Sequence, residues 1–197
     1  MARVVVFAAV SLDGFVARPN DDPGPIFDWY ENGEIAYTGD PERVFHLSRA
    51  SAAYLNTVWP DVRAEVIGRR LFDITNGWDG RPPVGDHVFV VTHEAPNDWP
   101  FTEAPFTFVT DGLASAVEQA RSFADDGIVS LSGGSLCGQA LAEGLVDEIS
   151  VQVAPVVLGS GVRFFGDFAG PETLLENPRV VEGDRVTHLH YLVRRTS

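Results

Sequence analysis

The chain has 197 residues, of which 45% are apolar and 21% are charged, the proportions of an ordinary globular protein of one domain. Its formal net charge of -14 and the absence of a basic stripe argue against nucleic acid as a partner. No apolar run is long enough to span a bilayer, so no membrane partner is expected, and the single cysteine, Cys137, excludes an internal disulfide and favours a reducing cytoplasm.

The first predicted element is a buried strand over residues 4–10, because this run is continuously apolar and bounded by turn residues. Residues 19–40 are rich in Pro, Gly, Asp and Asn, which predicts a long loop or lid. A helix is then expected from Asp40 to about residue 53. Asp40 is a candidate N-cap, Pro41 suits the first helical position, and Glu42 adds an acid to the first turn.

The rest of the chain alternates between strands and helices. The predicted strands cover residues 63–67, 87–92, 107–109, 128–131 and 148–157, and the predicted helices cover 69–75, 113–124 and 135–143. Residues 179–182 and 186–194 predict an antiparallel pair turned by Gly183 and Asp184. This order indicates one α/β domain over residues 1–197, with a mixed, mostly parallel central sheet flanked by helices and an antiparallel strand pair at the C-terminal end.

The most informative segment is a predicted strand that ends in a double glycine and leads into a helix. Gly133 and Gly134 can adopt backbone angles closed to other residues and let a ligand approach the main chain. The helix that follows begins with unsatisfied N–H groups and a partial positive charge. Together these features favour a phosphate or pyrophosphate site. A tight connection without a ligand is the alternative interpretation.

Ligands of such sheets bind beyond the carboxyl ends of the parallel strands. Small residues, hydroxyl groups and two arginines follow those ends in this chain, a composition that suits a cofactor with several phosphates, because arginine pairs with phosphate oxygens in a bidentate way. The residues concerned are Ala8, Ala9, Ser11 and Asp13 after the first strand, Gly68, Arg69 and Arg70 after the second, Thr92 after the third, and Ser132, Gly133, Gly134 and Ser135 after the fifth.

Four motifs occur in order in a chain whose resemblance runs from about residue 3 to residue 194: AVSLDGF at 9–15, IGRRLF at 67–72, LSGGS at 131–135 and PVVLGSG at 155–161. With these motifs the chain resembles the dihydrofolate reductase fold family. The branch that it is most similar to contains the C-terminal reductase domain of the bifunctional deaminase-reductase of riboflavin biosynthesis. The resemblance implies a sheet of eight or nine strands, NADPH-dependent reduction and a homodimer. Residues 148–157 and the C-terminal strand pair are candidates for the dimer interface, and the alternative is that loops cap both.

The resemblance also implies roles for single residues of the cofactor site. It places Ala9 at the nicotinamide carboxamide and Thr92 near the adenosine ribose and its phosphate. It places Gly68, Arg69 and Arg70 at the pyrophosphate and the 2′-phosphate end, and Gly133, Gly134, Ser135 and Leu136 under the pyrophosphate. The family often has a threonine where Leu71 stands, which removes one hydroxyl donor to the phosphates.

The catalytic residues are less clear from the sequence. A substrate that accepts hydride also needs a proton, and the candidate carboxyl groups are Asp13, which the resemblance places beside the substrate cavity, Asp28 and Glu31. Phe15, Phe27, Trp29 and Trp59 form either an apolar platform for a flat ring or the packing of the lid against the core. His188 and His190 alternate on a strand, but no third ligand has suitable spacing, so no metal is expected.

These observations lead to one functional hypothesis and one alternative. The hypothesis is an NADPH-dependent oxidoreductase that transfers a hydride to a small heterocyclic, carbonyl or imine substrate. We expect that substrate to be weakly charged, because Phe15 stands where the riboflavin branch commonly has a basic residue. The alternative is a nucleotide-binding module that keeps the reductase fold without turnover. A flavin-binding oxidoreductase is less favoured.

Overall fold

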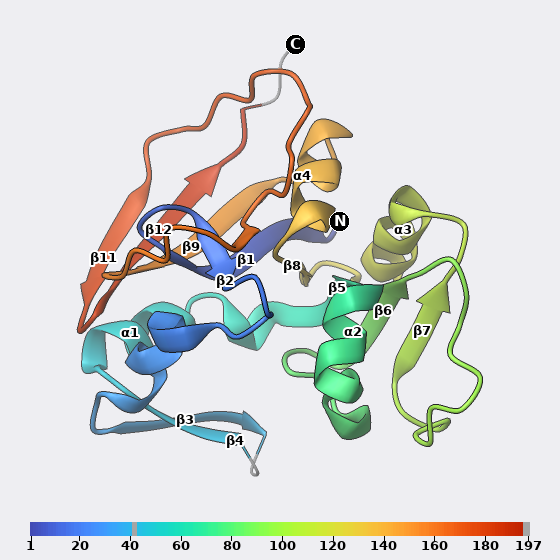
Figure 1. The fold of residues 1–197 in the computed structure, drawn as a ribbon, viewed down its shortest axis with the longest axis horizontal. Coiled ribbons are helices and arrows are strands. Elements are labelled where there is room, and N and C mark those ends of the chain that lie inside the picture. Colours follow the sequence, from blue (N-terminus) through green and yellow to red (C-terminus); the bar gives the residue numbers. More distant parts are fainter. Residues whose placement is uncertain (41–42, 195–197) are drawn as a thin grey trace.

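The computed structural model describes residues 1–40 and 43–194, and an eight-stranded sheet forms its centre (Figure 1). The strand order is β11-β12-β9-β1-β8-β5-β6-β7. The strands are β1 (Arg3–Ser11), β5 (Val62–Gly68), β6 (His87–Val91), β7 (Phe106–Val109), β8 (Ile128–Ser132), β9 (Glu148–Ala154), β11 (Arg179–Gly183) and β12 (Val186–Leu192).

Six neighbouring strands of this sheet, from β9 to β7, run parallel, and β12 and β11 continue it in antiparallel pairing. The predicted fold class is therefore confirmed, including the C-terminal strand pair. β9 ends before Pro155, because proline has no N–H to donate to the neighbouring strand. Two short antiparallel pairs lie outside the main sheet: β2 (Phe15–Ala17) with β10 (Val162–Arg163), and β3 (Ile35–Asp40) with β4 (Arg43–Leu47).

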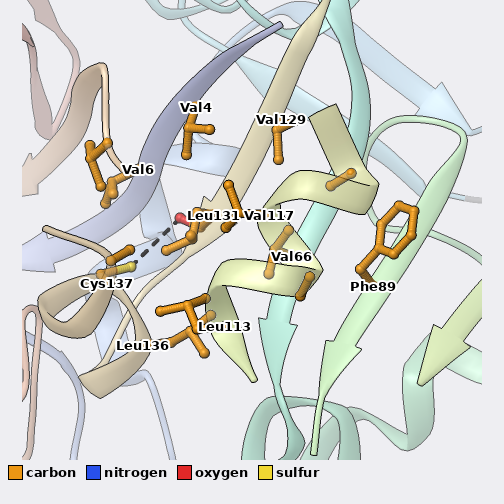
Figure 2. Close-up of a cluster of buried hydrophobic side chains, with 14 of the residues drawn as sticks. Val4, Val6, Val66, Phe89, Leu113, Val117, Val129, Leu131, Leu136 and Cys137 are labelled. Atoms are coloured by element: carbon orange, nitrogen blue, oxygen red, sulfur yellow. Dashed lines mark hydrogen bonds between the residues drawn. The ribbon is translucent and has the colours of Figure 1, made fainter. Parts of the chain in front are cut away.

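Two helices cover one face of the sheet: α3 (Leu113–Ala124) and α4 (Ser135–Ala142). Alternate residues of the central strands point to this face, and Val4, Val66 and Leu131 are fully buried there (Figure 2). Cys137 belongs to the same cluster and its thiol lies 3.7 Å from the carbonyl oxygen of Leu131. Burial raises the pKa of this thiol, so Cys137 is a core residue rather than a nucleophile.

The opposite face is covered only at its sides. On one side lie the 3₁₀ helix η1 (Gly24–Glu31), the β3–β4 hairpin and α1 (Arg49–Leu55), and on the other side lies α2 (Arg69–Thr75) (Figure 1). Two further 3₁₀ turns, η2 (Trp59–Asp61) and η3 (Asn76–Gly80), complete the flanks. The strands between these flanks, β1, β8 and β5, therefore expose side chains to a space that no helix fills.

The segment before α1 differs from the sequence-based expectation. Residues 19–40 are not a continuous loop, since they contain η1 and strand β3. The helix expected from Asp40 to residue 53 is wrong in its first half, where β4 runs as the second strand of a hairpin. The helix begins at Arg49, with Ser48 as its N-cap. Pro41 and Glu42, which suggested the earlier start, lie outside the described residues.

The position of β9 bears on the expectation that residues 148–157 lie at a dimer interface. β9 pairs with β1 on one side and with β12 on the other, and six of its seven residues are buried. This strand therefore offers no free edge to a second subunit. β11 is the terminal strand of the sheet at this end, and Val180 on it is 57% exposed.

Among the described residues, no helix has the length and apolar character needed to cross a membrane.

Candidate functional site

A cavity of about 1040 Å³ opens on the incompletely covered face of the sheet and runs along β1, β8 and β5 to their carboxyl ends. Alternate residues of β8, Ile128, Ser130 and Ser132, line it, together with Phe7 and Ala9 of β1 and Glu65 of β5. The volume is at or above the upper end of the roughly 300–1,000 Å³ that is typical of ligand sites. The cavity divides into a half rich in glycine and arginine and a half rich in aromatic side chains.

The glycine-rich half is built around the start of α4. Gly133, Gly134, Ser135 and Leu136 all line it. Gly134 has a φ of +85° and its carbonyl oxygen accepts from the N–H of Cys137 at 3.1 Å, but no side chain caps the first N–H groups of α4. A Cβ atom on Gly133 would lie 3.6 Å from the Cβ of Ala8, which shows how closely this turn approaches the end of β1. Ala9 and Gly68, which the family resemblance assigns to the cofactor site, also line the cavity.

Two arginines line this half as well. Arg70, on α2, forms a bidentate ion pair with Asp21, with both N–O distances at 3.0 Å, and this pair links α2 to the segment that precedes η1. Arg163, on β10, is exposed and also lines the cavity. Leu71 lines the cavity as an apolar residue, where a threonine would add a hydroxyl donor. The sequence does not predict Arg163 as a site residue, because β10 has only two residues and is too short to be recognised as a strand.

Arg69 and Thr92 lie together beside the cavity rather than among the residues that line it. The guanidinium of Arg69 donates to the Thr92 hydroxyl at 3.3 Å and to the carbonyl oxygen of Glu94 at 2.7 Å. It also pairs with Asp73 one helical turn later, at 2.7 Å. Arg69 and Thr92 are thus in contact, and both are residues that the family resemblance places near the adenosine end of the cofactor.

The aromatic half lies between η1, the β3–β4 hairpin and the turn at η2. Tyr30 and Phe45 pack with their ring centroids 4.5 Å apart, and Phe7 meets Trp59 edge to face at 5.9 Å. Phe27 also lines this half, so two residues of the predicted platform, Phe27 and Trp59, are found here. Phe15 and Trp29 are not. Trp29 is 1% exposed and packs in the core against His188.

Glu65 is a further residue of this cavity that the sequence did not predict. It lies on β5, is 3% exposed and lines the cavity. The Ser132 hydroxyl donates a hydrogen bond to its Oε1, whereas its Oε2 is buried and has no hydrogen-bond partner among the described residues. Burial raises the pKa of Glu65 to about 7, against the opposing effects of the Ser132 hydrogen bond and the positive charge of Arg43. Glu65 is therefore an acid that exchanges a proton near neutral pH.

The two carboxyl groups predicted as catalytic lie elsewhere. Asp13 is outside the residues that line the cavity, and it accepts hydrogen bonds from the N–H groups of Leu158 and Gly159 at 3.0 and 2.7 Å. A hydrogen bond from the Ser11 side chain, followed by those two backbone bonds, holds the pKa of Asp13 below its ordinary value. Asp28 is an exposed residue of η1 that does not line the cavity.

The described part of the chain holds no group of three or more His, Cys, Asp or Glu side chains placed to bind a metal ion. The two histidines on β12 have other contacts. The Nε2 of His188 lies 2.9 Å from the Ser51 hydroxyl in the core, and the Nε2 of His190 lies 2.7 Å from Glu148. Burial lowers the pKa of His188 to about 4, so its ring is neutral at physiological pH.

Comparisons with known proteins agree with this architecture. The chain is 24% identical over 190 residues to the uncharacterized protein YwjB of Bacillus subtilis (strain 168), covering 96% of this chain and 97% of that one. A Shewanella sp. PV-4 structure that carries a provisional riboflavin-biosynthesis name is 25% identical, with a TM-score of 0.65 over 99% of this chain and 100% of that one.

A pyrimidine reductase-like protein from Corynebacterium diphtheriae shares the fold at 15% identity, with a TM-score of 0.60 over 99% of this chain and 93% of that one. A Thermotoga maritima deaminase and 5-amino-6-(5-phosphoribosylamino)uracil reductase does so at 13% identity, with a TM-score of 0.59 over 98% of this chain and 57% of that one. The profile of the RibD C-terminal domain matches residues 2–188. This chain therefore belongs to the RibD C-terminal domain family, and its fold is that of the reductase domain.

Proposed function

We propose that the protein is an NADPH-dependent reductase that transfers a hydride to a small heterocyclic, carbonyl or imine substrate. The observation that carries the proposal is a single cavity that joins a glycine turn and helix start, suited to phosphate, with an aromatic half suited to a flat ring. Its volume of about 1040 Å³ gives room for two ligands side by side. Membership of the reductase-domain family supports the same reaction class.

The residues of the glycine-rich half fit a phosphorylated dinucleotide by their donor chemistry. The uncapped N–H groups at the start of α4 and the guanidinium groups of Arg70 and Arg163 would hold the pyrophosphate. Arg69 and Thr92 would meet the 2′-phosphate end, and main-chain groups at Ala9 would meet the nicotinamide. When bound, the cofactor supplies the hydride, and the protein supplies orientation and electrostatics.

The aromatic half supports a substrate with a flat, weakly charged ring. Phe27, Tyr30, Phe45 and Trp59 give it large apolar faces, on which such a ring can stack. Asp13 and Asp28 stay candidates for the proton donor on the sequence evidence alone. Because neither Asp13 nor Asp28 lines the cavity, a proton donor inside the cavity is favoured over both.

Thermal unfolding with each nicotinamide cofactor tests the proposal. We expect NADPH to raise the Tm of the protein clearly more than NADH does, because only NADPH carries the 2′-phosphate that Arg69 and Thr92 would meet. Arg70→Ala should weaken NADPH binding by about tenfold, which is the loss of one charge-assisted contact. Arg194→Ala is the matched control, since Arg194 is also an exposed arginine paired with a carboxylate, Glu176.

The absence of a Tm shift with either cofactor would contradict the proposed function. Cofactor binding without NADPH consumption across pterins, pyrimidines and quinones would instead support the non-catalytic module. The homodimer and the cytoplasmic location stay predictions. Sedimentation velocity of the wild type and of a Val180→Lys variant at the β11 edge would test the dimer.

A further inference from the structure

Glu65 has chemistry that neither the family assignment nor the proposed cofactor site uses. An ionised carboxylate in an apolar cavity is costly unless both oxygens accept hydrogen bonds. Only Oε1 of Glu65 has a partner, the Ser132 hydroxyl, and the buried Oε2 has none among the described residues. The neutral acid is therefore favoured, and its proton is available to a ligand in the cavity.

The position of Glu65 places this acid between the two halves of the cavity. In the register of the sheet, Glu65 on β5 lies opposite Ser130 on β8, and its carboxyl group reaches forward to Ser132. Ser132 immediately precedes the glycine turn at Gly133. Ser132 also lies opposite Phe7 on β1, whose ring packs against Trp59 of the aromatic half. A proton on the Glu65 carboxyl group is thus next to both the glycine-rich half, where the dinucleotide would bind, and the aromatic half.

The aromatic half also limits the charge of what it binds. Arg43 is the cation that the described structure places there, and it is already engaged. Its guanidinium donates to the carbonyl oxygens of Arg81 and Pro82 at 3.0 and 3.4 Å. The groups suited to phosphate, around α4 and Arg70, all lie in the other half. A ring without a phosphate group suits the aromatic half best.

Other titratable groups around the cavity do not replace Glu65 as the acid. Tyr30, which faces the cavity from η1, has its pKa raised by burial and keeps its proton at neutral pH. Asp21 is held in its ion pair with Arg70 of α2, and Asp167 follows Gly166, which packs against Ser135 in the glycine-rich half, away from the aromatic half. Arg43 faces Glu65 from β4 and lowers its pKa without reversing the effect of burial.

We propose that Glu65 is the proton donor in the reduction of a flat, phosphate-free ring that carries a carbon–nitrogen double bond. The inference rests on the proposed NADPH-dependent function for the hydride. In the balanced step, the substrate carbon gains the hydride, the substrate nitrogen takes the proton from Glu65, and the cofactor is oxidised by two electrons. The Glu65 carboxylate is then reprotonated from solvent.

Infrared difference spectroscopy tests the acid without any turnover. We expect the wild type to show a protonated carboxyl band that disappears with an apparent pKa near 7, and Glu65→Gln to lack it. Glu148→Gln is the matched control, because Glu148 is equally buried but is paired with Arg3 and His190. If the band is absent from the wild type, or persists in Glu65→Gln, the proposal is overturned.

Steady-state kinetics tests the proton transfer, with 3,4-dihydroisoquinoline as a flat imine and menadione as a quinone that gains its proton from water. Glu65→Gln should reduce the imine about 100-fold more slowly and menadione nearly as fast as the wild type does. Wild-type imine reduction should fall about tenfold per pH unit above pH 7. Glu118→Gln, an exposed carboxyl on α3, should leave both rates unchanged.

Fluorescence titration with NADPH separates the two proposals. If the wild type does not bind NADPH, the proposed function fails, whereas the infrared band still decides the state of Glu65. If the wild type binds NADPH but does not reduce the imine, the role of Glu65 as proton donor is overturned and the cofactor site stands. If Glu65→Gln binds NADPH and reduces the imine at the wild-type rate, the role is overturned as well.

Discussion

Two glutamates on inner strands of the same sheet have opposite surroundings. Glu65 on β5 is 3% exposed and Glu148 on β9 is 4% exposed. Glu148 lies 2.6 Å from the guanidinium of Arg3 and 2.7 Å from the Nε2 of His190, so both of its oxygens are used. Burial by itself would raise the pKa of Glu148, but the hydrogen bonds from His190 and Arg3 outweigh it and lower that pKa.

The comparison shows that the number of partners, rather than burial, decides the charge of a carboxyl group in this sheet. Glu148, with an arginine and a histidine as partners, is an ionised structural group that ties the start of β9 to its neighbours. Glu65, with one hydroxyl partner, keeps its proton to about neutral pH. The same residue type therefore stabilises one part of the protein and supplies a reactive proton in another.

The largest effect is expected for the stability of Glu65→Gln. The pKa of Glu65 is raised from 4.5 in the unfolded chain to about 7. The folded protein therefore binds the proton more tightly, and wild-type stability falls as the pH rises from 4.5 to 7 and stays low above that. This costs roughly 3 kcal/mol at pH 8, so Glu65→Gln should be more stable there and similar to the wild type near pH 4. Urea unfolding at both pH values measures the difference.

Glu148→Gln should have the opposite effect on stability. It removes the charge that Arg3 and His190 neutralise, at a cost of about 1–2 kcal/mol at pH 7, because the Arg3 side chain is half exposed. The pKa of Glu148 is lowered, so its stabilisation is present above 4.5 and is lost as the pH falls through the lower folded value. The same urea experiments should show the difference from the wild type shrinking towards pH 3. A constant difference would contradict this assignment.

The smallest effect is expected for Ser132→Ala. The Ser132 hydroxyl stabilises the ionised form of Glu65, so its removal should raise the apparent pKa of Glu65 further. The infrared titration of the carboxyl band measures this shift. A fall in the apparent pKa would show that the hydroxyl does not donate to the carboxylate, and would weaken the contrast between the two glutamates.

Much of the sheet could be predicted from the sequence because its inner strands are continuous apolar runs, such as residues 4–10. The β3–β4 hairpin could not be predicted, because it mixes polar and apolar residues, and the dipeptide at Asp40 and Pro41 imitates a helix start. The sequence predicts Trp29 in a loop or lid, because the residues around it are typical of turns. Only the packing of η1 on β9 and β1 shows that its side chain is buried.

The candidate site, like the fold, could be predicted from the sequence only in part. The glycine turn was predictable because Gly133 and Gly134 act through backbone geometry that a sequence motif carries. Glu65 was not, because one charged residue in a strand normally marks the face towards solvent. Whether that face meets water or a cavity depends on which distant segments cover it. Here those segments are η1 and β4, which precede Glu65 in the sequence, and α2, which follows directly after β5.

The ion pair between Arg70 and Asp21 has a consequence for ligand entry. Both residues line the cavity, and the pair fastens helix α2 to the stretch of chain before η1. Asp21 takes the Nε and Nη2 donors, so an anion in the cavity binds the guanidinium on its Nη1 side and shares the positive charge with Asp21. Occupation of the glycine-rich half thus weakens the ion pair, and faster proteolytic cleavage near Asp21 becomes a reporter of a full site.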